Sequence, residues 1–382
     1  MHVLSPGSEI QIFTLSGIDM RTLATAFSIA AVAAFGLAAC GGNSDSNTPP
    51  PSAGTFKETV LVSDGSVSAP NIDPNLKNGW GVAFNPTGTF WVADNNTQKS
   101  TLYNGNGVVQ SLVVTIPPAA SGKLASPTGM LFNSTPDFSI TANGATSNAV
   151  FMWATLAGTI AAWSPKVLPT EAVTVHDDGA GAAEYTGLTI ASNAGASTLY
   201  AADFHNGKVD MFDKTFTKLS VPGAFTDPTI PAGMNPFGIQ AIGSTIFVSY
   251  AKLGPDGLKQ QNGPGNGFVD AYDLSGHLLR RITSGGVLNS PWGLAVAPAN
   301  FGAVSNELLV GNFGDGTINA FDPNTGASKG ALTQADGTKV TQPGIWGIEF
   351  GNNVDNQPSN TLFFAAGPTP TTGVFGRIDS SQ

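Results

Sequence analysis

The sequence predicts an all-β protein, a six-bladed β-propeller with blades of about four antiparallel strands. Three observations predict it: frequent turn formers, a Gly-centred phrase that recurs six times, and alternating strand patterns between the copies. The 382 residues include 47 Gly and 26 Pro, and only 11% are charged. Such a composition is typical of short strands joined by tight turns, and 41% apolar residues are ample for a core.

The repeated phrase places polar and aromatic residues before a Gly and three or four apolar residues after it. One copy reads SPWGLAVAP at 290–298, and another reads NGWGVAFN at 78–85. The central glycines recur every 48 to 58 residues, at Gly81, Gly129, Gly187, Gly238, Gly293 and Gly347. This spacing fits one sheet of about four strands per copy. Copies that pack face to face around a ring bury both sheet faces and hide the long edges.

The segments outside the phrase complete this architecture. The run SLVVTIP at 111–117 is an example of a fourth strand between copies. FKETVLVSDGSV at 56–67 precedes the first copy, and we expect it to join the last blade and close the ring. A β-helix is the competing architecture, but its rungs are shorter than the observed spacing.

The fifth copy carries the most specific sequence signal. WGLAV at 292–296, LLVGNF at 308–313 and GTINAFDPNTG at 316–326 together resemble an NHL repeat. The segment 57–379 resembles a family of bacterial secreted propeller proteins of uncharacterised activity. The resemblance implies the propeller fold and implies no established activity.

The single cysteine, Cys40, lies in a segment with the features of an export signal. Arg21 precedes the apolar stretch 22–36, and LAACG at 37–41 resembles the bacterial lipobox, in which the cysteine is lipidated. A buried thiol or a short membrane helix is the alternative, although the stretch is shorter than a membrane span needs. Glu9 and Asp19 do not suit a basic leader, so we expect translation to begin at Met20.

These observations predict three segments: a signal peptide at 1–39, of which 1–19 is a mis-assigned upstream start; the lipidated Cys40 with a flexible linker at 40–56; and the propeller at 57–382. The expected location is the bacterial cell envelope, anchored by lipid in the outer membrane or facing the periplasm. A formal charge of −10 without any basic run argues against nucleic-acid binding. The expected partners are a cell-envelope component or a small-molecule ligand, with the chain itself a monomer.

Propeller ligands bind at a mouth of the central channel, and the phrase marks the innermost strand of each blade. Three residues before each glycine, five of six copies carry a polar side chain: Asn78, Ser126, Glu184, Asn235 and Ser290, with Gly344 in the sixth. We expect these residues to ring one mouth, either as ligand contacts or as loop caps in a wet channel.

A second ring is expected where the second strand of each copy ends, at Asp94, Thr155, Asp203, Tyr250 and Asn312. Asp94 and Asn312 complete the set of ligand-binding candidates. Oxygen ligands that converge from several blades suit Ca²⁺, and Asp203, Asn235 and Asn312 are the candidate metal ligands. No other cofactor is indicated.

Two features bear on activity. Asp203 and His205 in ADFHNGK are the candidate catalytic pair, because in NHL-type lyases and lactonases His and acidic groups at the mouth hold a metal and act as base. Aromatic residues recur just before the glycine, as inter-blade packing or as a platform for a sugar or another flat ligand: Trp80, Phe237, Trp292 and Trp346. The sequence therefore favours a binding module, with a metal-dependent lactonase or lyase and a surface adhesion or assembly scaffold as alternatives.

Overall fold

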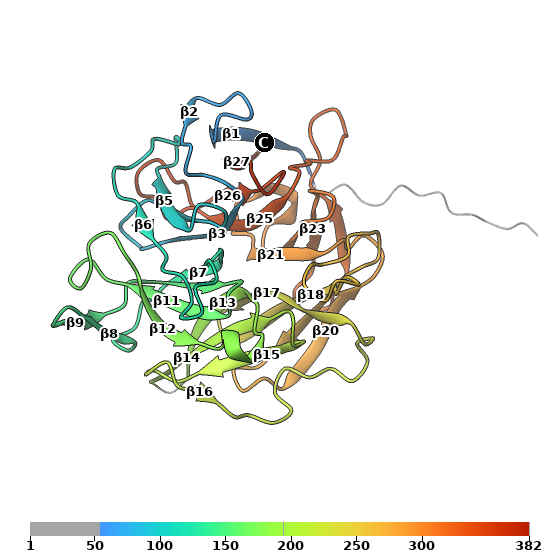
Figure 1. Ribbon diagram of the computed structural model, residues 1–382. Helices are drawn as coiled ribbons and strands as arrows, with labels where there is room; N and C mark the ends of the chain where they lie inside the picture. The colour runs from blue at the N-terminus through green and yellow to red at the C-terminus, as the bar shows by residue number, and fades with distance from the viewer. Residues whose placement is uncertain (1–53, 194, 382) are drawn as a thin grey trace, which may run out of the picture. The chain divides into compact units, whose positions relative to one another are not determined.

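A computed structural model describes residues 54–193 and 195–381 (Figure 1). These residues belong to the unit Pro49–Gln382, one of two into which the chain divides. Cys40, the expected signal peptide and most of the expected linker lie outside the described residues. Helix in the described ranges is confined to two 3₁₀ turns, η1 (Gly179–Gly181) and η2 (Gly302–Val304). Within these ranges no helix has the length and apolar character that crossing a membrane requires.

Six sheets form the blades, and each runs outward from a strand that begins with the repeated phrase. Blade 1 contains β3 (Gly79–Phe84), β4 (Phe90–Asp94), β5 (Lys99–Tyr103) and β6 (Val114–Thr115). Blade 2 contains β7 (Pro127–Phe132), β10 (Phe151–Thr155), β11 (Thr159–Trp163) and β12 (Val173–Asp177). Blade 3 contains β13 (Tyr185–Asn193), β14 (Ala196–Asp203), β15 (Lys208–Phe212) and β16 (Lys218–Leu219).

The remaining blades follow the same order. Blade 4 contains β17 (Met234–Ile242), β18 (Thr245–Lys252), β19 (Phe268–Tyr272) and β20 (Leu278–Ser284). Blade 5 contains β21 (Pro291–Val296), β22 (Leu308–Asn312), β23 (Ile318–Phe321) and β24 (Ser328–Ala331). Blade 6 contains β25 (Ile345–Phe350), β26 (Thr361–Ala366), β27 (Val374–Ser380), β1 (Phe56–Ser63) and β2 (Asn71–Ile72). A separate hairpin of β8 (Ser139–Ala142) and β9 (Ala145–Asn148) extends from blade 2.

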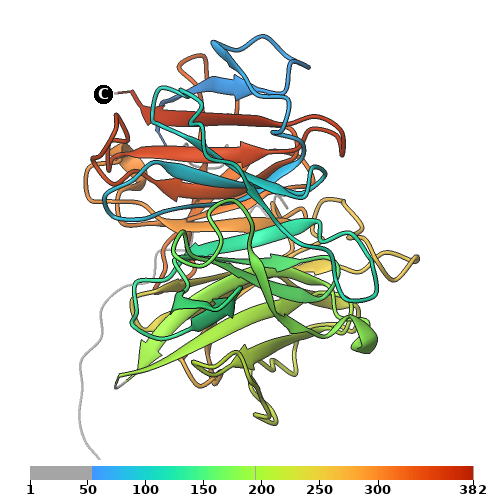
Figure 2. The same cartoon turned by 60° about the vertical axis from the view of Figure 1, so that its left-hand side comes forward.

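The N-terminal strand closes the ring, as the sequence predicts. β1 pairs antiparallel with β27 from Phe56↔Ser380 to Ser63↔Val374, and the two lie side by side in Figures 1 and 2. Strands from opposite ends of the chain thus share one blade, so the last blade forms only when both ends are in place.

The cores lie between blades. Six clusters of buried apolar side chains each join the facing surfaces of two neighbouring sheets. The second strand of blade 1 is buried along its whole length, and so are those of blades 2, 5 and 6. Burial on both faces explains why these strands read as apolar runs rather than as alternating patterns.

The repeated glycine is explained by close contact between innermost strands. Each innermost strand touches the next around the ring, and β25 touches β3. A Cβ on Gly238 would lie 2.1 Å from the Trp292 carbonyl oxygen, and a Cβ on Gly347 would lie 2.6 Å from the Trp80 carbonyl oxygen. At every one of the six glycines the nearest atom to such a Cβ belongs to the following blade. The phrase therefore recurs because only glycine lets the strands approach so closely.

The position three residues before the glycine has a backbone role as well. In four blades it adopts a left-handed conformation, with φ values of 53° at Asn78, 50° at Ser126, 48° at Ser290 and 67° at Gly344. Gly tolerates this conformation without strain, and Asn adopts it more readily than most residues. The small and polar residues of the predicted first ring are thus explained in part by the turn that begins each blade.

Candidate functional site: a pocket at one mouth of the propeller axis

A pocket of about 420 Å³ occupies the mouth where the innermost strands begin. Its floor is aromatic, and its walls come from loops of several blades. The floor consists of Trp80, Phe204, Phe237, Phe313 and Trp346. A concave site with apolar floor and polar rim is the usual form of a small-molecule site.

The floor is built by the repeated phrase. Trp80, Phe237, Trp292 and Trp346 each directly precede a repeated glycine and meet at the axis from four blades. The rings of Trp80 and Trp346 stack with centroids 3.5 Å apart, and Phe313 stacks on Trp346 at 3.9 Å. These contacts close the channel, so the pocket ends at an aromatic layer.

The indole N–H groups of this layer differ in their partners. Trp292 donates to the Thr186 carbonyl at 3.0 Å, and Trp346 donates to Oδ1 of Asn78 at 3.2 Å. Trp80 is 5% exposed, and its Nε1–H has no acceptor within the described chain. The buried N–H groups of Trp153 and Trp163 also lack acceptors, but these side chains lie in the core between blades 1 and 2. Of these three tryptophans, Trp80 is the one whose side chain lines the mouth pocket.

Amides form one side of the rim. Asn78 donates to Oδ1 of Asn95 at 3.2 Å, and Asn95 donates to the Pro127 carbonyl at 3.1 Å. On the loop between β18 and β19, Lys259 and Gln260 line the pocket, and neither side chain has a hydrogen-bond or ion-pair partner in residues 54–193 or 195–381. The rim thus combines fixed amides with long side chains that are available to a ligand.

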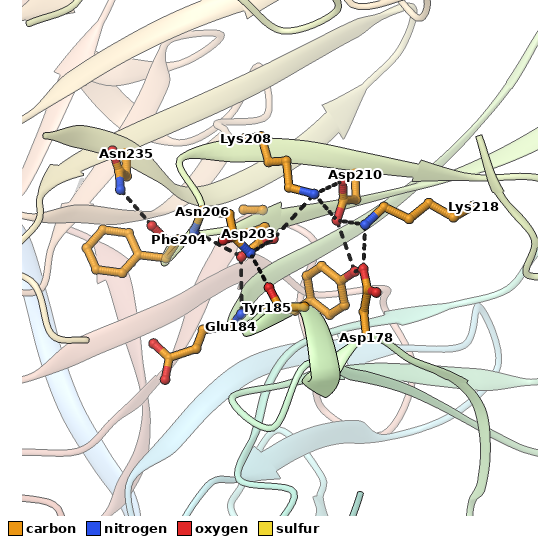
Figure 3. Close-up of polar contacts among 12 residues, drawn as sticks. Asp178, Glu184, Tyr185, Asp203, Phe204, Asn206, Lys208, Asp210, Lys218 and Asn235 are labelled. Atoms are coloured by element: carbon orange, nitrogen blue, oxygen red, sulfur yellow. Dashed lines mark hydrogen bonds and ion pairs between the residues drawn. The ribbon is translucent and has the colours of Figure 1, made fainter. Parts of the chain in front are cut away.

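Glu184 is the carboxylate of the pocket. Burial raises its pKa, Asp203 adds to that rise, and the charges of Lys123 and His205 oppose it. Its Oε1 lies 3.7 Å from Nζ of Lys123, and only 11% of the side chain is exposed. Figure 3 shows the carboxylate pointing away from the neighbouring polar network. Glu184 can accept hydrogen bonds from a ligand in the pocket.

Comparison with known proteins shows the family and the fold of the chain. No family model matches the chain. It is 34% identical over 342 residues to "Uncharacterized protein L690" of Acanthamoeba polyphaga mimivirus, covering 86% of this chain and 87% of that protein. A second mimivirus relative, "Uncharacterized protein R648", is 34% identical over 303 residues, which are 77% of this chain and 73% of its own. The chain belongs to the family of these two mimivirus proteins.

Among solved structures, this family member is similar to sugar dehydrogenases. The apo form of the soluble aldose sugar dehydrogenase from Escherichia coli aligns with a TM-score of 0.50 and 12% identity, over 86% of this chain and all of that one. A structure described as glucose dehydrogenase aligns with a TM-score of 0.50 and 11% identity, over 85% of this chain and all of that one. At such low identity the likeness shows the shared propeller fold alone.

The structure brings together part of the first predicted ring. Asn78, Ser126 and Glu184 all line the mouth pocket. Asn235 does not line it, and its Nδ2 donates to the Phe204 carbonyl at 2.7 Å. Ser290 is fully buried, and its Oγ has no partner in the described chain.

The second predicted ring lies one residue away from the pocket lining. Asp94, Asp203 and Asn312 are fully buried and do not line the pocket. Four of the five residues that directly follow the predicted positions line the pocket: Asn95, Leu156, Phe204 and Phe313. The fifth, Ala251, does not. The shift follows from strand alternation, because neighbouring residues at a strand end face opposite directions.

Asp203 belongs to a polar network within blade 3 (Figure 3). Its Oδ1 accepts from the Glu184 N–H at 3.1 Å, and its Oδ2 accepts from Nδ2 of Asn206 at 2.8 Å. Its Oδ2 also lies 3.7 Å from Nζ of Lys208. Burial raises the pKa of Asp203, and the hydrogen bonds from Asn206 and Glu184 lower it. These contacts hold the Asp203 carboxylate within blade 3.

The other candidates for metal binding and catalysis are also held by local contacts. Nδ1 of His205 is 2.6 Å from the Gly257 carbonyl oxygen and so fixes the loop that carries Lys259 and Gln260. Oδ1 of Asn312 accepts from the Asn289 N–H at 3.1 Å. In the part of the chain that the structure describes, no three His, Cys, Asp or Glu side chains are grouped closely enough to hold a metal ion.

Sequence reasoning missed Phe204, Phe313, Lys259 and Gln260. The two phenylalanines carried a signal, because each directly follows the polar residue at the end of a second strand. Lys259 and Gln260 carried none, since the path of their long loop over the pocket depends on the contact with His205.

Proposed function

We propose that this chain is a ligand-binding propeller whose mouth pocket takes a neutral carbohydrate. The observation that carries the proposal is Trp80, whose side chain lines the pocket and whose buried Nε1–H has no partner within the described chain. A sugar offers an apolar C–H face to stack on an aromatic ring and hydroxyl oxygens that accept hydrogen bonds. We propose that a sugar meets both needs at Trp80.

The rim supports the same class of ligand. Asn96, Gln260 and Glu184 supply amide and carboxylate groups that suit the hydroxyl groups of a sugar. The pocket contains one carboxylate, Glu184, and one ammonium group, Lys259, so it has no excess positive charge for a phosphate. Apolar floor, polar rim and balanced charge together favour a neutral polyol over an anion.

The proposal includes the finer features expected from the sequence. The repeat is NHL-like, the propeller spans 57–382, and lipidation of Cys40 would hold the module at a cell-envelope surface, where polysaccharides and glycosylated partners occur. Replacement of Cys40 by Ser is expected to abolish incorporation of a labelled fatty acid in a bacterial host. Equal labelling of the two forms would overturn the lipid anchor and leave the pocket proposal intact.

The experiment on the pocket is a tryptophan fluorescence titration with a panel of neutral mono- and disaccharides. Trp80→Phe keeps most of the aromatic surface and removes the N–H donor. It is expected to weaken binding about tenfold, as the loss of one buried hydrogen bond does. Trp163→Phe is the matched control, because it removes an equally unpaired N–H outside the pocket.

Two results would contradict the proposal. One is the absence of saturable binding by any saccharide in the panel. The other is an equal loss of affinity in Trp80→Phe and Trp163→Phe, which would show that the effect does not arise in the pocket. The metal-dependent lactonase or lyase stays an alternative prediction. It ranks second because its candidate metal ligands, Asp203, Asn235 and Asn312, are each engaged in local hydrogen bonds.

A further inference from the structure

A second cavity lies along the axis beyond the aromatic layer. A narrow space of about 30 Å³ is lined by the repeated glycines Gly81, Gly129, Gly293 and Gly347. It shares lining residues with a larger cavity of about 260 Å³, among them Met130, Leu188, Gln240 and Glu349. Neither space shares a residue with the mouth pocket, so this region is distinct from the proposed sugar site.

Most of the side chains that line the second cavity are apolar, although polar atoms supply more of its exposed wall. The residue after each repeated glycine faces the narrow space and is aliphatic or Met in all six blades: Val82, Met130, Leu188, Ile239, Leu294 and Ile348. Phe84, Phe132 and Ile190 extend the apolar wall in the larger cavity. These side chains would hold a short alkyl group.

Two polar side chains interrupt this wall in both spaces. Gln240 and Glu349 each lie two residues after a repeated glycine, in blades 4 and 6. Thr189 occupies the same position in blade 3, but its Oγ1 already accepts from the Ala241 N–H at 3.0 Å. The side-chain amide of Gln240 has no hydrogen-bond partner among residues 54–193 and 195–381. Its oxygen is therefore available to a donor.

Glu349 lacks a counterion. Its Oε1 accepts from the Phe350 N–H at 3.2 Å, and no Lys, Arg or His of the described ranges lies within ion-pair distance. Burial raises the pKa of Glu349 to about 7, and no neighbouring charge contributes to that rise. A carboxylate in such surroundings gains more from an incoming cation than an exposed one does, because the cation replaces lost hydration.

We infer that this cavity binds a primary alkylammonium ion, with its ammonium group on Glu349 and Gln240 and its alkyl chain against Phe84, Phe132 and Met130. The single carboxylate favours an organic cation over Ca²⁺, which takes six to eight oxygen ligands. The two phenylalanine rings add an apolar surface that also attracts cations. The inference is independent of the sugar site on the other side of the aromatic layer.

The test is isothermal titration calorimetry of the full chain at pH 8 with butylammonium chloride, beside its neutral analogue 1-butanol. We expect saturable binding of butylammonium, little binding of 1-butanol, and a loss of at least tenfold in Glu349→Gln. Glu58→Gln is the matched control, because burial also raises the pKa of Glu58 to about 7 and this side chain lines neither cavity. We expect it to bind butylammonium as the wild type does.

A second measurement keeps the test valid if Glu349→Gln does not fold. Glu349 is the titratable side chain that lines these cavities, so wild-type binding of butylammonium is expected to weaken at least tenfold between pH 8 and pH 5.5. Binding that is unchanged in folded Glu349→Gln, or equal for butylammonium and 1-butanol, would overturn the inference. Displacement of butylammonium by micromolar Ca²⁺ would also overturn it, by showing a metal site.

Discussion

Glu184 and Asp203 are joined by one hydrogen bond, yet they lie in two polar regions built in opposite ways. Asp203 accepts hydrogen bonds from Asn206 and from the Glu184 backbone, inside a network whose groups are paired (Figure 3). The Glu184 carboxylate points into a pocket and has one cation, at 3.7 Å. The contrast shows that pairing of a side chain, rather than its residue type, separates structural acids from those that can meet a ligand.

The paired region extends to the outer strands of blade 3. Asp210 accepts from the Tyr185 hydroxyl at 3.0 Å and forms ion pairs with Lys208 at 2.9 Å and Lys218 at 2.6 Å. Blade 4 repeats this arrangement at Asp270, which pairs with Arg281 at 2.8 Å. Two adjacent blades thus use a buried acid and a basic residue of the fourth strand to join their outer strands.

The largest loss of stability is expected at the six repeated glycines, where neighbouring innermost strands are in closest contact. Gly238→Ala would place a Cβ 2.1 Å from the Trp292 carbonyl oxygen and is expected to lower the free energy of unfolding by about 3 kcal/mol or more. Urea unfolding followed by tryptophan fluorescence measures it. Gly311→Ala is the control, since its Cβ would meet its nearest atom at 3.8 Å. Equal stability of the two variants would argue against close packing of the innermost strands.

The next effect tests the paired region. Asp210→Ala removes an acceptor that Lys208, Lys218 and the Tyr185 hydroxyl share, while Asp178 still accepts from Lys218 and Tyr185. Loss of one partner of a buried ion pair costs about 3 to 5 kcal/mol, and the partial exposure of the two lysines reduces the expected loss to about 2 kcal/mol. Chemical unfolding measures this loss. Sugar affinity should not change, and a variant that kept its stability but lost sugar binding would reverse the assignment of the two regions.

A smaller effect is expected from the unpaired acid on the other side of the aromatic layer. Burial raises the pKa of Glu349 to about 7 from an ordinary value of 4.5. Between pH 4.5 and pH 7 the Glu349 side chain is ionised in the unfolded chain but still protonated in the folded protein. The free energy of unfolding therefore falls as the pH rises through this range, and it falls no further above pH 7. Glu349→Gln should remove this loss and be more stable than wild type at pH 8 by about 1 to 2 kcal/mol, allowing for partial exposure.

Thermal unfolding of Glu349→Gln and wild type at pH 4.5 and pH 8 measures this difference. The difference should nearly vanish at pH 4.5, where Glu349 is protonated in the folded state and half protonated in the unfolded chain. A wild type that gains stability relative to the variant as the pH rises would show that the carboxylate has a partner.

The smallest effect is expected at Glu184. Burial disfavours its charge and Lys123 favours it, so Glu184→Gln should change the free energy of unfolding by less than about 0.5 kcal/mol. Urea unfolding at pH 7 checks this value. A loss of 2 kcal/mol or more would place Glu184 with the structural acids of blade 3.

The fold was predictable because close packing of the innermost strands requires glycine at the same position in every blade. Gly81 and its five equivalents are required by contact between neighbouring strands, and this requirement is visible as a period in the sequence. The mouth residues were predictable only in part, since Asp203 and Phe204 are adjacent and the strand end decides which one faces the axis. Glu349 was not predictable, because an acid in a strand usually marks a solvent-exposed face.

The central claim is that the unpaired groups of the mouth pocket, and not the paired acids of blade 3, meet the ligand. A crystal structure of the full chain soaked with the tightest-binding saccharide of the panel tests it most directly. We expect density for a sugar ring against the aromatic floor of the pocket, with a hydroxyl oxygen about 2.7 to 3.2 Å from Nε1 of Trp80. Sugar bound at Asp203 and Asp210, or a pocket without sugar at saturating concentration, would contradict the claim.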